Sequence, residues 1–336
     1  ARLWTDGRYF IQAAAQLKGT TVELMKMGEP GVPEMNAYIE EVLKEGETLG
    51  FDGRVVSVGE GEGYAAIAGK KNAKVNYQVD LIDEIWEDRP VLSEEPAFNL
   101  DVKYAGETVA SKLARIREEM KEAGTNVHVV STIDDICWTL NIRGNDIDFF
   151  PLVLSYGIIT MDSFELYIDE KKLDDKLKAK LAKDGVNLHP YNDIYEDVKK
   201  FGSDVVAMID PGKLNYALFN NIPENVKTIE KRNPAILMKA IKNPVEIENI
   251  RKAQIKDSVA HVRFMKWLKE NVGKMRITEM SASDKLDEFR AEMGNFIRPS
   301  FEPISSFGEH GAIVHYTSSP ETDVELKEGQ LFLTDT

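Results

Sequence analysis

The spacing of apolar residues changes repeatedly between two periods along the chain, and each change marks a predicted element. In residues 109–120 the apolar positions recur at helical spacing, which predicts an amphipathic helix ended by Gly124. The β-branched run 127–130 predicts a strand directly after it. Further strands are expected at 164–168 and 205–209, and further helices at 171–181, near Tyr195 and at 214–219. This alternation predicts an α/β region with a mixed or parallel sheet.

Both flanks of this region carry the same two patterns. On the amino-terminal side the expected elements are strands at 3–5, within LGFDGRVVSV and within VNYQVD, and helices at 9–17, 33–43 and 61–68. On the carboxyl side, Asn243, Pro244 and Glu246 form a capping-box pattern with a first-turn proline. This pattern opens a helix predicted to end near Asn271. Its expected apolar stripe comprises Ile247, Ile250, Val262, Met265 and Leu268. A second helix is predicted at 278–290.

The stretch 298–336 gathers the residues best suited to chemistry. It contains His310 and His315, and its apolar strand Leu331-Phe332-Leu333 leads to Asp335. A carboxylate at the end of a buried strand is a common metal ligand. One Asp and one His are nevertheless too few for a site, because three or more ligands are normally needed.

Several motifs, in order along the whole chain, carry a resemblance to a known family. GAIVHY, a turn with Pro320, and EGQLFLTDT resemble the metallopeptidase half of aminopeptidase P, the Xaa-Pro aminopeptidase branch of the pita-bread (creatinase/prolidase, peptidase M24) family. WTDGRYFIQA, MGEPGVP and LGFDGRVVS resemble its amino-terminal domain. TIDDICWTLNIRGNDIDFFPLVLSYGIITM resembles the middle of the three-domain type. KNPVEIENIRKAQIKDSVA and SASDKLDEFR resemble the first helices of its pita-bread domain.

The resemblance implies a fold. It implies an α/β chain with two creatinase N-terminal-like (ribonuclease H-like) domains, at 1–104 and 105–232, followed by the start of a pita-bread α+β domain at 233–336. The first residues lack a Met, and four of the family's five metal ligands are missing after Asp335. We therefore expect a chain truncated at both ends.

The resemblance also implies an activity and a site. The family removes the amino-terminal residue that precedes proline in peptides. It uses two divalent metal ions, usually manganese and sometimes zinc or cobalt. Asp335 matches the first of the five metal ligands, and His315 matches a catalytic histidine that contacts the substrate near the scissile carbonyl. His310 is a second candidate for substrate binding, with a place in an exposed loop as the alternative. The 336-residue chain alone is expected to be inactive.

Two other functions remain open at this point. Pita-bread domains without metals bind peptides or proteins, and a chain ending near Asp335 fits such a module. Prolidase or creatinase is a second alternative, although these usually lack the extra middle domain. Gln254 and Ser258 depart from the family pattern, where His and Gly are common; neither matches a metal ligand.

Composition and net charge limit the classes of binding partner that we expect. With 43% hydrophobic and 29% charged residues the chain resembles a soluble globular protein, and its net charge of −15 disfavours nucleic acid and anionic membranes. No signal peptide opens it, and its single cysteine, Cys137, fits a reducing compartment and a buried, inert thiol. We expect a cytoplasmic protein that acts on peptides, and, from the resemblance, a homodimer.

The remaining acidic and histidine residues are interpreted as structural. Four carboxylates, Asp134, Asp135, Asp146 and Asp148, lie close together in the sequence. The first two fit a helical first turn, and Asn145-Asp146 fits a turn, so no metal cluster is expected. The three other histidines, on a predicted strand, loop and helix, show no ligand spacing to a carboxylate; they are His128, His189 and His261.

Overall fold

The structure is a computed structural model that describes residues 1–336. It divides into two compact units, one formed by residues 39–247 and the other by residues 1–38 together with 248–336. The domain boundaries expected at 104 and 232 remain a prediction, and each unit is described by itself.

A six-stranded mixed sheet organises the unit of residues 39–247. Its order is β10-β9-β8-β6-β11-β12, and β8 runs antiparallel to both of its neighbours whereas the other pairs are parallel. The strands are β6 (Val127–Val130), β8 (Tyr156–Thr160), β9 (Phe164–Tyr167), β10 (Val186–His189), β11 (Val206–Ile209) and β12 (Lys227–Glu230).

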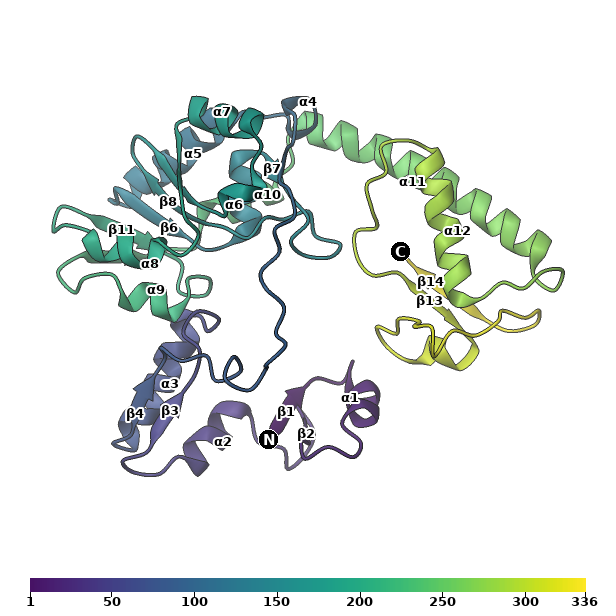
Figure 1. The fold of residues 1–336 in the computed structure, drawn as a ribbon, viewed down its shortest axis with the longest axis horizontal. Coiled ribbons are helices and arrows are strands. Elements are labelled where there is room, and N and C mark those ends of the chain that lie inside the picture. Colours follow the sequence, from purple (N-terminus) through teal and green to yellow (C-terminus); the bar gives the residue numbers. More distant parts are fainter. The chain divides into compact units, whose positions relative to one another are not determined.

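Helices cover both faces of this sheet (Figure 1). One face packs against α5 (Val109–Glu122), α6 (Ile133–Leu140), α7 (Asp175–Lys183) and α10 (Pro234–Ala240). The opposite face packs against α8 (Ile194–Asp197), the short helix η2 (Val198–Lys200) that directly follows it, and α9 (Tyr216–Asn220). Adjacent residues of β6 enter different cores, Val129 on the α8 side and Val130 on the α5 side, as expected for the two faces of a strand. The predicted α/β class with a mixed sheet is confirmed.

The rest of this unit is built from smaller pieces. The helix α3 (Val58–Lys70) links the parallel strands β3 (Thr48–Gly50) and β4 (Lys74–Asn76). A second pair joins β5 (Phe98–Asn99) to β7 (Ile142–Arg143), and the short helices α4 (Val102–Ala105) and η1 (Glu170–Lys172) complete the unit. Gly61 of α3 lies against Tyr216 of α9 so closely that an added Cβ would come 2.3 Å from the ring.

Three sequence expectations in this unit are wrong in detail. Val55 and Val56 belong to a turn and bend rather than a strand, because Ser57 and Glu60 form the capping box that starts α3. The helix expected at 171–181 starts at Asp175, because the Asp174 carboxylate accepts the Leu177 N–H at 2.7 Å. His189, expected in a loop, ends the strand β10.

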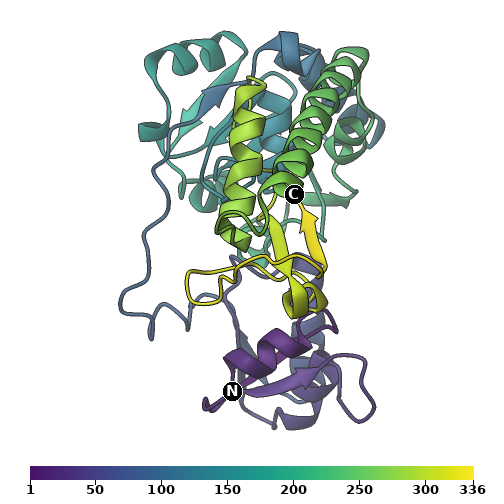
Figure 2. The same ribbon diagram turned by 90° about the vertical axis from the view of Figure 1, so that its right-hand side faces the viewer.

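The other unit places two helices beside a hairpin. The helices are α11 (Pro244–Asn271), whose first four residues fall in the 39–247 unit, and α12 (Glu279–Glu292). Figure 2 shows them side by side, and the Arg290–Asp257 ion pair joins them at 2.7 Å. The antiparallel strands β13 (Ile304–Phe307) and β14 (Phe332–Asp335) pack on α12 together with η3 (Gly308–Ala312). Residues 1–38 add the parallel pair β1 (Arg2–Thr5) and β2 (Glu23–Lys26), the helix α1 (Phe10–Gln16) and the start of α2 (Met35–Val42).

The long helix α11 confirms one prediction and corrects another. Its capping box is present: Glu246 N–H donates to Asn243 Oδ1 at 3.0 Å, and Asn243 N–H donates to Glu246 Oε2 at 2.9 Å. The predicted apolar stripe is wrong, because only Leu268 of its members packs against the core of this unit. The buried stripe instead runs through Ala260 and Phe264, which face α12 and the hairpin. No helix is both long and apolar enough to cross a membrane.

Candidate functional site

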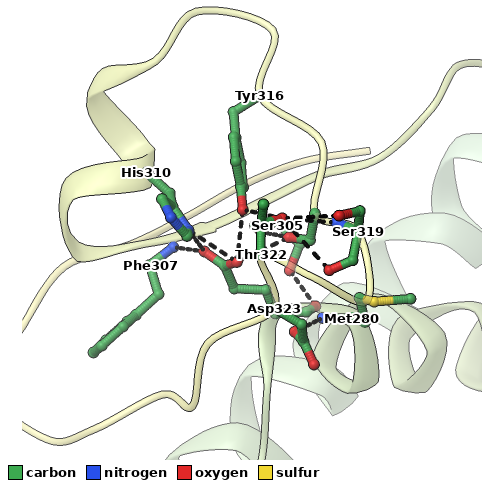
Figure 3. Close-up of polar contacts among 10 residues, drawn as sticks. Met280, Ser305, Phe307, His310, Tyr316, Ser319, Thr322 and Asp323 are labelled. Carbon is green, nitrogen blue, oxygen red and sulfur yellow. Dashed lines mark hydrogen bonds and ion pairs between the residues drawn. The ribbon is translucent and has the colours of Figure 1, made fainter. Parts of the chain in front are cut away.

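A fully buried carboxylate at the start of α12 receives several polar contacts from the 298–336 stretch. Thr278 caps the helix, and Glu279 follows it in the first turn with no exposed surface. Four groups converge on its carboxylate (Figure 3): Phe307 N–H at 2.5 Å, His310 Nδ1 at 3.0 Å, Ser318 Oγ at 2.9 Å and Tyr316 Oη at 3.3 Å. These five residues are called the Glu279 network below.

His310 lies inside this network rather than in an exposed loop. Its side chain is 17% exposed, and its ring stacks on Tyr316 with centroids 4.3 Å apart. Burial raises the pKa of the Tyr316 hydroxyl above its ordinary value, and the charge of Glu279 adds to this. Because Nδ1 contacts Glu279, Nε2 is the ring nitrogen left for another molecule.

His315 lies on the same segment but outside the network. Its side chain is exposed, and its backbone has a φ of 57°, in the left-handed region. Its ring stacks on Tyr9, with centroids 5.6 Å apart and an interplanar angle of 16°. A non-glycine residue in this conformation is uncommon and persists where its surroundings hold it.

Asp335 ends β14, opposite Ile304 of β13, and its side chain is exposed. The next residue is held firmly: Arg290 donates to Thr336 Oγ1 at 2.7 Å and to its carbonyl oxygen at 3.3 Å. All three predicted site residues lie in one unit. His310 lies on η3, His315 lies in the loop after it, and Asp335 lies at the end of the hairpin.

The residues of this chain do not by themselves fit a dimetal centre. Nowhere do three or more His, Cys, Asp or Glu side chains gather so as to hold a metal ion. Asp335 is therefore a single carboxylate donor, whereas a metal site normally needs three or more ligands.

Two acidic residues of the middle region, Asp135 and Asp146, contact donors of the protein, and the expected place of Asp134 and Asp135 in a helical first turn is confirmed. Asp135 accepts from Thr132 Oγ1 at 2.6 Å and forms an ion pair with Lys239 at 2.8 Å. Asp146 is buried and pairs at 2.6 Å with Lys172, which is also buried. Both oxygens of Asp135 therefore have protein donors, whereas Asp146 uses only Oδ2, and its buried Oδ1 has no hydrogen-bond partner.

The remaining histidines and the cysteine need one correction. His128 is buried between Met208 and Asn233, and desolvation lowers its pKa. The expectation that no carboxylate pairs with the other two is wrong. His189 contacts Glu165 at 2.7 Å across neighbouring strands, and His261 lies 3.7 Å from a carboxylate one helical turn before it, Asp257. Cys137 is buried, as expected, and burial raises its thiol pKa to about 11.

Two family models match this chain in succession. Residues 88–246 match the creatinase/prolidase N-terminal domain, and residues 248–336 match metallopeptidase family M24. The two matches adjoin at residue 247, in the first turns of α11, and one of the two divisions of the chain into compact units falls at the same residue.

Known relatives are similar over the whole length of the chain. Aminopeptidase P2 of Arabidopsis thaliana is 34% identical over 100% of this chain and 52% of its own length. A probable Xaa-Pro aminopeptidase P of Laccaria bicolor is 36% identical over 100% of the chain and 53% of its own length. The chain thus spans about half the length of these relatives.

A solved structure shows the same fold. The X-prolyl aminopeptidase of Caenorhabditis elegans, described as a cytosolic enzyme with a di-nuclear active site, is 32% identical and superposes with a TM-score of 0.93. The match covers 99% of this chain and 56% of that one. Residues 88–336 thus match a creatinase/prolidase N-terminal domain followed by metallopeptidase family M24, and the chain resembles the aminopeptidases P along its whole length.

Proposed function

We propose that the protein is an Xaa-Pro aminopeptidase, a metal-dependent hydrolase that releases the amino-terminal residue preceding proline in a peptide. The observation that carries this proposal is the similarity to the X-prolyl aminopeptidase of C. elegans, at 32% identity and a TM-score of 0.93 over 99% of the chain. The same similarity supports a pair of divalent metal ions and a cytoplasmic location, since that enzyme is described as cytosolic and di-nuclear.

The proposed roles of the site residues are those that the family resemblance implies. Asp335 supplies one carboxylate to the metals from the end of β14, and its oxygen donors suit manganese, with zinc or cobalt as alternatives. His315, exposed on its loop, contacts the substrate near the scissile carbonyl and stabilises the charge that develops there. His310 contacts the peptide through Nε2. The partners proposed are peptides with proline second and a second copy of the chain in a homodimer.

A first test concerns the chain by itself. We expect the 336 residues to release no first residue from an Xaa-Pro-Yaa peptide with added manganese, because they provide no three-ligand cluster. Turnover that survives removal of host peptidases would contradict this. Two alternatives predict other results in a form of the protein that carries the remaining metal ligands. A non-catalytic binding module would bind the peptide without turnover. A prolidase would prefer Xaa-Pro dipeptides to longer peptides.

A second test separates the two main residues, in an active form that carries the remaining ligands. Asp335→Asn removes a charged ligand, so metal content and activity should fall together. His315→Ala should keep both metals while kcat/KM falls by about 10²-fold or more. The role of His315 is wrong if its Ala variant loses metal as fully as Asp335→Asn does, or keeps normal turnover at normal metal content.

A further inference from the structure

The Glu279 network holds one short segment at several points. Phe307 begins the segment, His310 lies one turn later in η3, and Ser318 ends it. His315 lies between these points and has no contact with the carboxylate. One buried side chain on α12 therefore fixes both ends of the loop that carries the exposed histidine.

The polar groups around Glu279 favour a hydrogen-bond acceptor at its carboxylate. The Phe307 N–H can only donate, and the serine and tyrosine hydroxyls can donate to an ionised carboxylate, which accepts at both oxygens. The first turn of α12 also favours a negative charge at this position. Under these conditions His310 presents Nδ1–H to Glu279, so that its Nε2 is the nitrogen without the proton when the ring is neutral.

We propose that Glu279 is a positioning residue of the peptidase site: its carboxylate fixes the Nδ1–H form of His310 and holds the 307–318 segment that carries His315. This inference rests on the proposed function, because it assigns Glu279 to the same site. Substrate contacts are made by His315 and by Nε2 of His310, whereas Glu279, at 0% exposure, acts only through them.

An isosteric variant separates this role from simple packing. Glu279→Gln keeps the shape but replaces one acceptor oxygen by an NH₂ donor, which cannot accept from the groups that converge there. The matched control is Glu309→Gln, which removes the same charge from an exposed residue next to His310. Neither experiment requires catalytic turnover, and both use the 336-residue chain.

The readouts are the ¹⁵N shifts of the histidine rings and amide hydrogen exchange. In the unmodified chain at a pH where His310 is neutral, its Nδ1 should show the protonated shift. In Glu279→Gln the Nε2–H form of His310 should gain population. Amide exchange at 308–318 should rise about tenfold relative to the amides of α12 and β13. Glu309→Gln should change neither readout.

Two outcomes overturn the proposal. The first is an unchanged His310 tautomer and unchanged exchange in a folded Glu279→Gln protein. The second concerns the case in which that variant does not fold. Ser318→Ala removes the 2.9 Å contact with Glu279, together with the 3.1 Å hydrogen bond from the same hydroxyl to the Ser305 carbonyl. Amide exchange at 311–318 must then rise in Ser318→Ala, and unchanged exchange refutes the anchoring role. Because both are spectroscopic, they can fail while the peptidase assays succeed, and the reverse also holds.

Discussion

At the scale of single residues, burial controls the chemistry of several ionisable groups. Lys112 is buried in α5 and has no carboxylate partner. Its ammonium donates to the Trp138 carbonyl at 2.7 Å and to Asn141 Oδ1 at 2.6 Å, and it lies over the Trp138 ring. These contacts tie α5 to the left-handed residue that ends α6. Desolvation lowers the pKa of Lys112 from 10.5 to about 8.

This lowered pKa predicts a pH effect on stability. Between about pH 8 and 10.5 the unfolded chain holds a proton on Lys112 that the folded chain has released, so this residue makes the free energy of unfolding rise with pH. Denaturant titrations across this window should show the rise as a difference between the unmodified chain and Lys112→Met, in which the group is absent. A difference that stays constant with pH would contradict the prediction.

Cys137 gives a second prediction at this scale. With the side chain buried and the thiol pKa raised to about 11, almost no thiolate is exposed near pH 8. A disulfide reagent should therefore modify the native chain only as fast as it unfolds, and modify it at once in denaturant. Rapid stoichiometric labelling with an unchanged circular dichroism spectrum would show that the thiol is accessible.

At the scale of elements, sequence patterns locate most helices and strands of the α/β unit, because each follows a local rule. The helix opened by Asn243 has its predicted cap and its predicted end at Asn271. Local rules fail where distant residues decide. The apolar pattern of α11 predicts the wrong buried face, since the buried side of this helix depends on where α12 packs. No sequence pattern singles out Glu279, because an acidic first-turn residue ordinarily lies in solvent, and only the folded loop buries it.

The contact between α3 and α9 gives a prediction with an internal control. At Gly61 a methyl group would come 2.3 Å from a ring carbon of Tyr216, whereas at Gly63, on the same helix, nothing lies within 4 Å. Gly61→Ala should lower the free energy of unfolding by about 1–3 kcal/mol. Gly63→Ala should instead raise it by about 0.5–1 kcal/mol, because alanine favours the helix. Equal effects of the two substitutions would contradict the close packing.

At the scale of the whole molecule, the carboxyl-terminal boundary of the middle domain differs between the family resemblance and the packing of the structure. The family resemblance places a boundary at 232, whereas α10 follows it and contributes Ala235 and Met238 to the core beneath α5 and α6. Asn233 also bonds Asp135 at 2.9 Å and His128 at 3.2 Å. The sequence indicates the order of domains but not this packing, because the α10 residues show no pattern that names their partners.

The two boundaries can be compared directly. A fragment of residues 105–247 should melt at a clearly higher temperature than one of residues 105–232, because the shorter one exposes the core that α10 covers. A third fragment, 105–247 with Ala235→Asp, provides the control, since a buried unpaired charge should remove the advantage. Equal melting temperatures for the first two fragments would support the boundary at 232.

The buried ion pair of Asp146 and Lys172 has a consequence for how this sequence can change over generations. Replacing either residue alone leaves the other charge stranded in the interior, at a cost of about 3–5 kcal/mol. That is a large part of the 5–15 kcal/mol by which a protein is ordinarily stable. A joint replacement by two apolar residues of similar volume removes both charges and leaves only the Leu154 N–H, which donates to Asp146 at 2.7 Å, without its acceptor. The two positions are therefore expected to change together, and a library of paired substitutions should contain folded members that are more stable than either of their single substitutions.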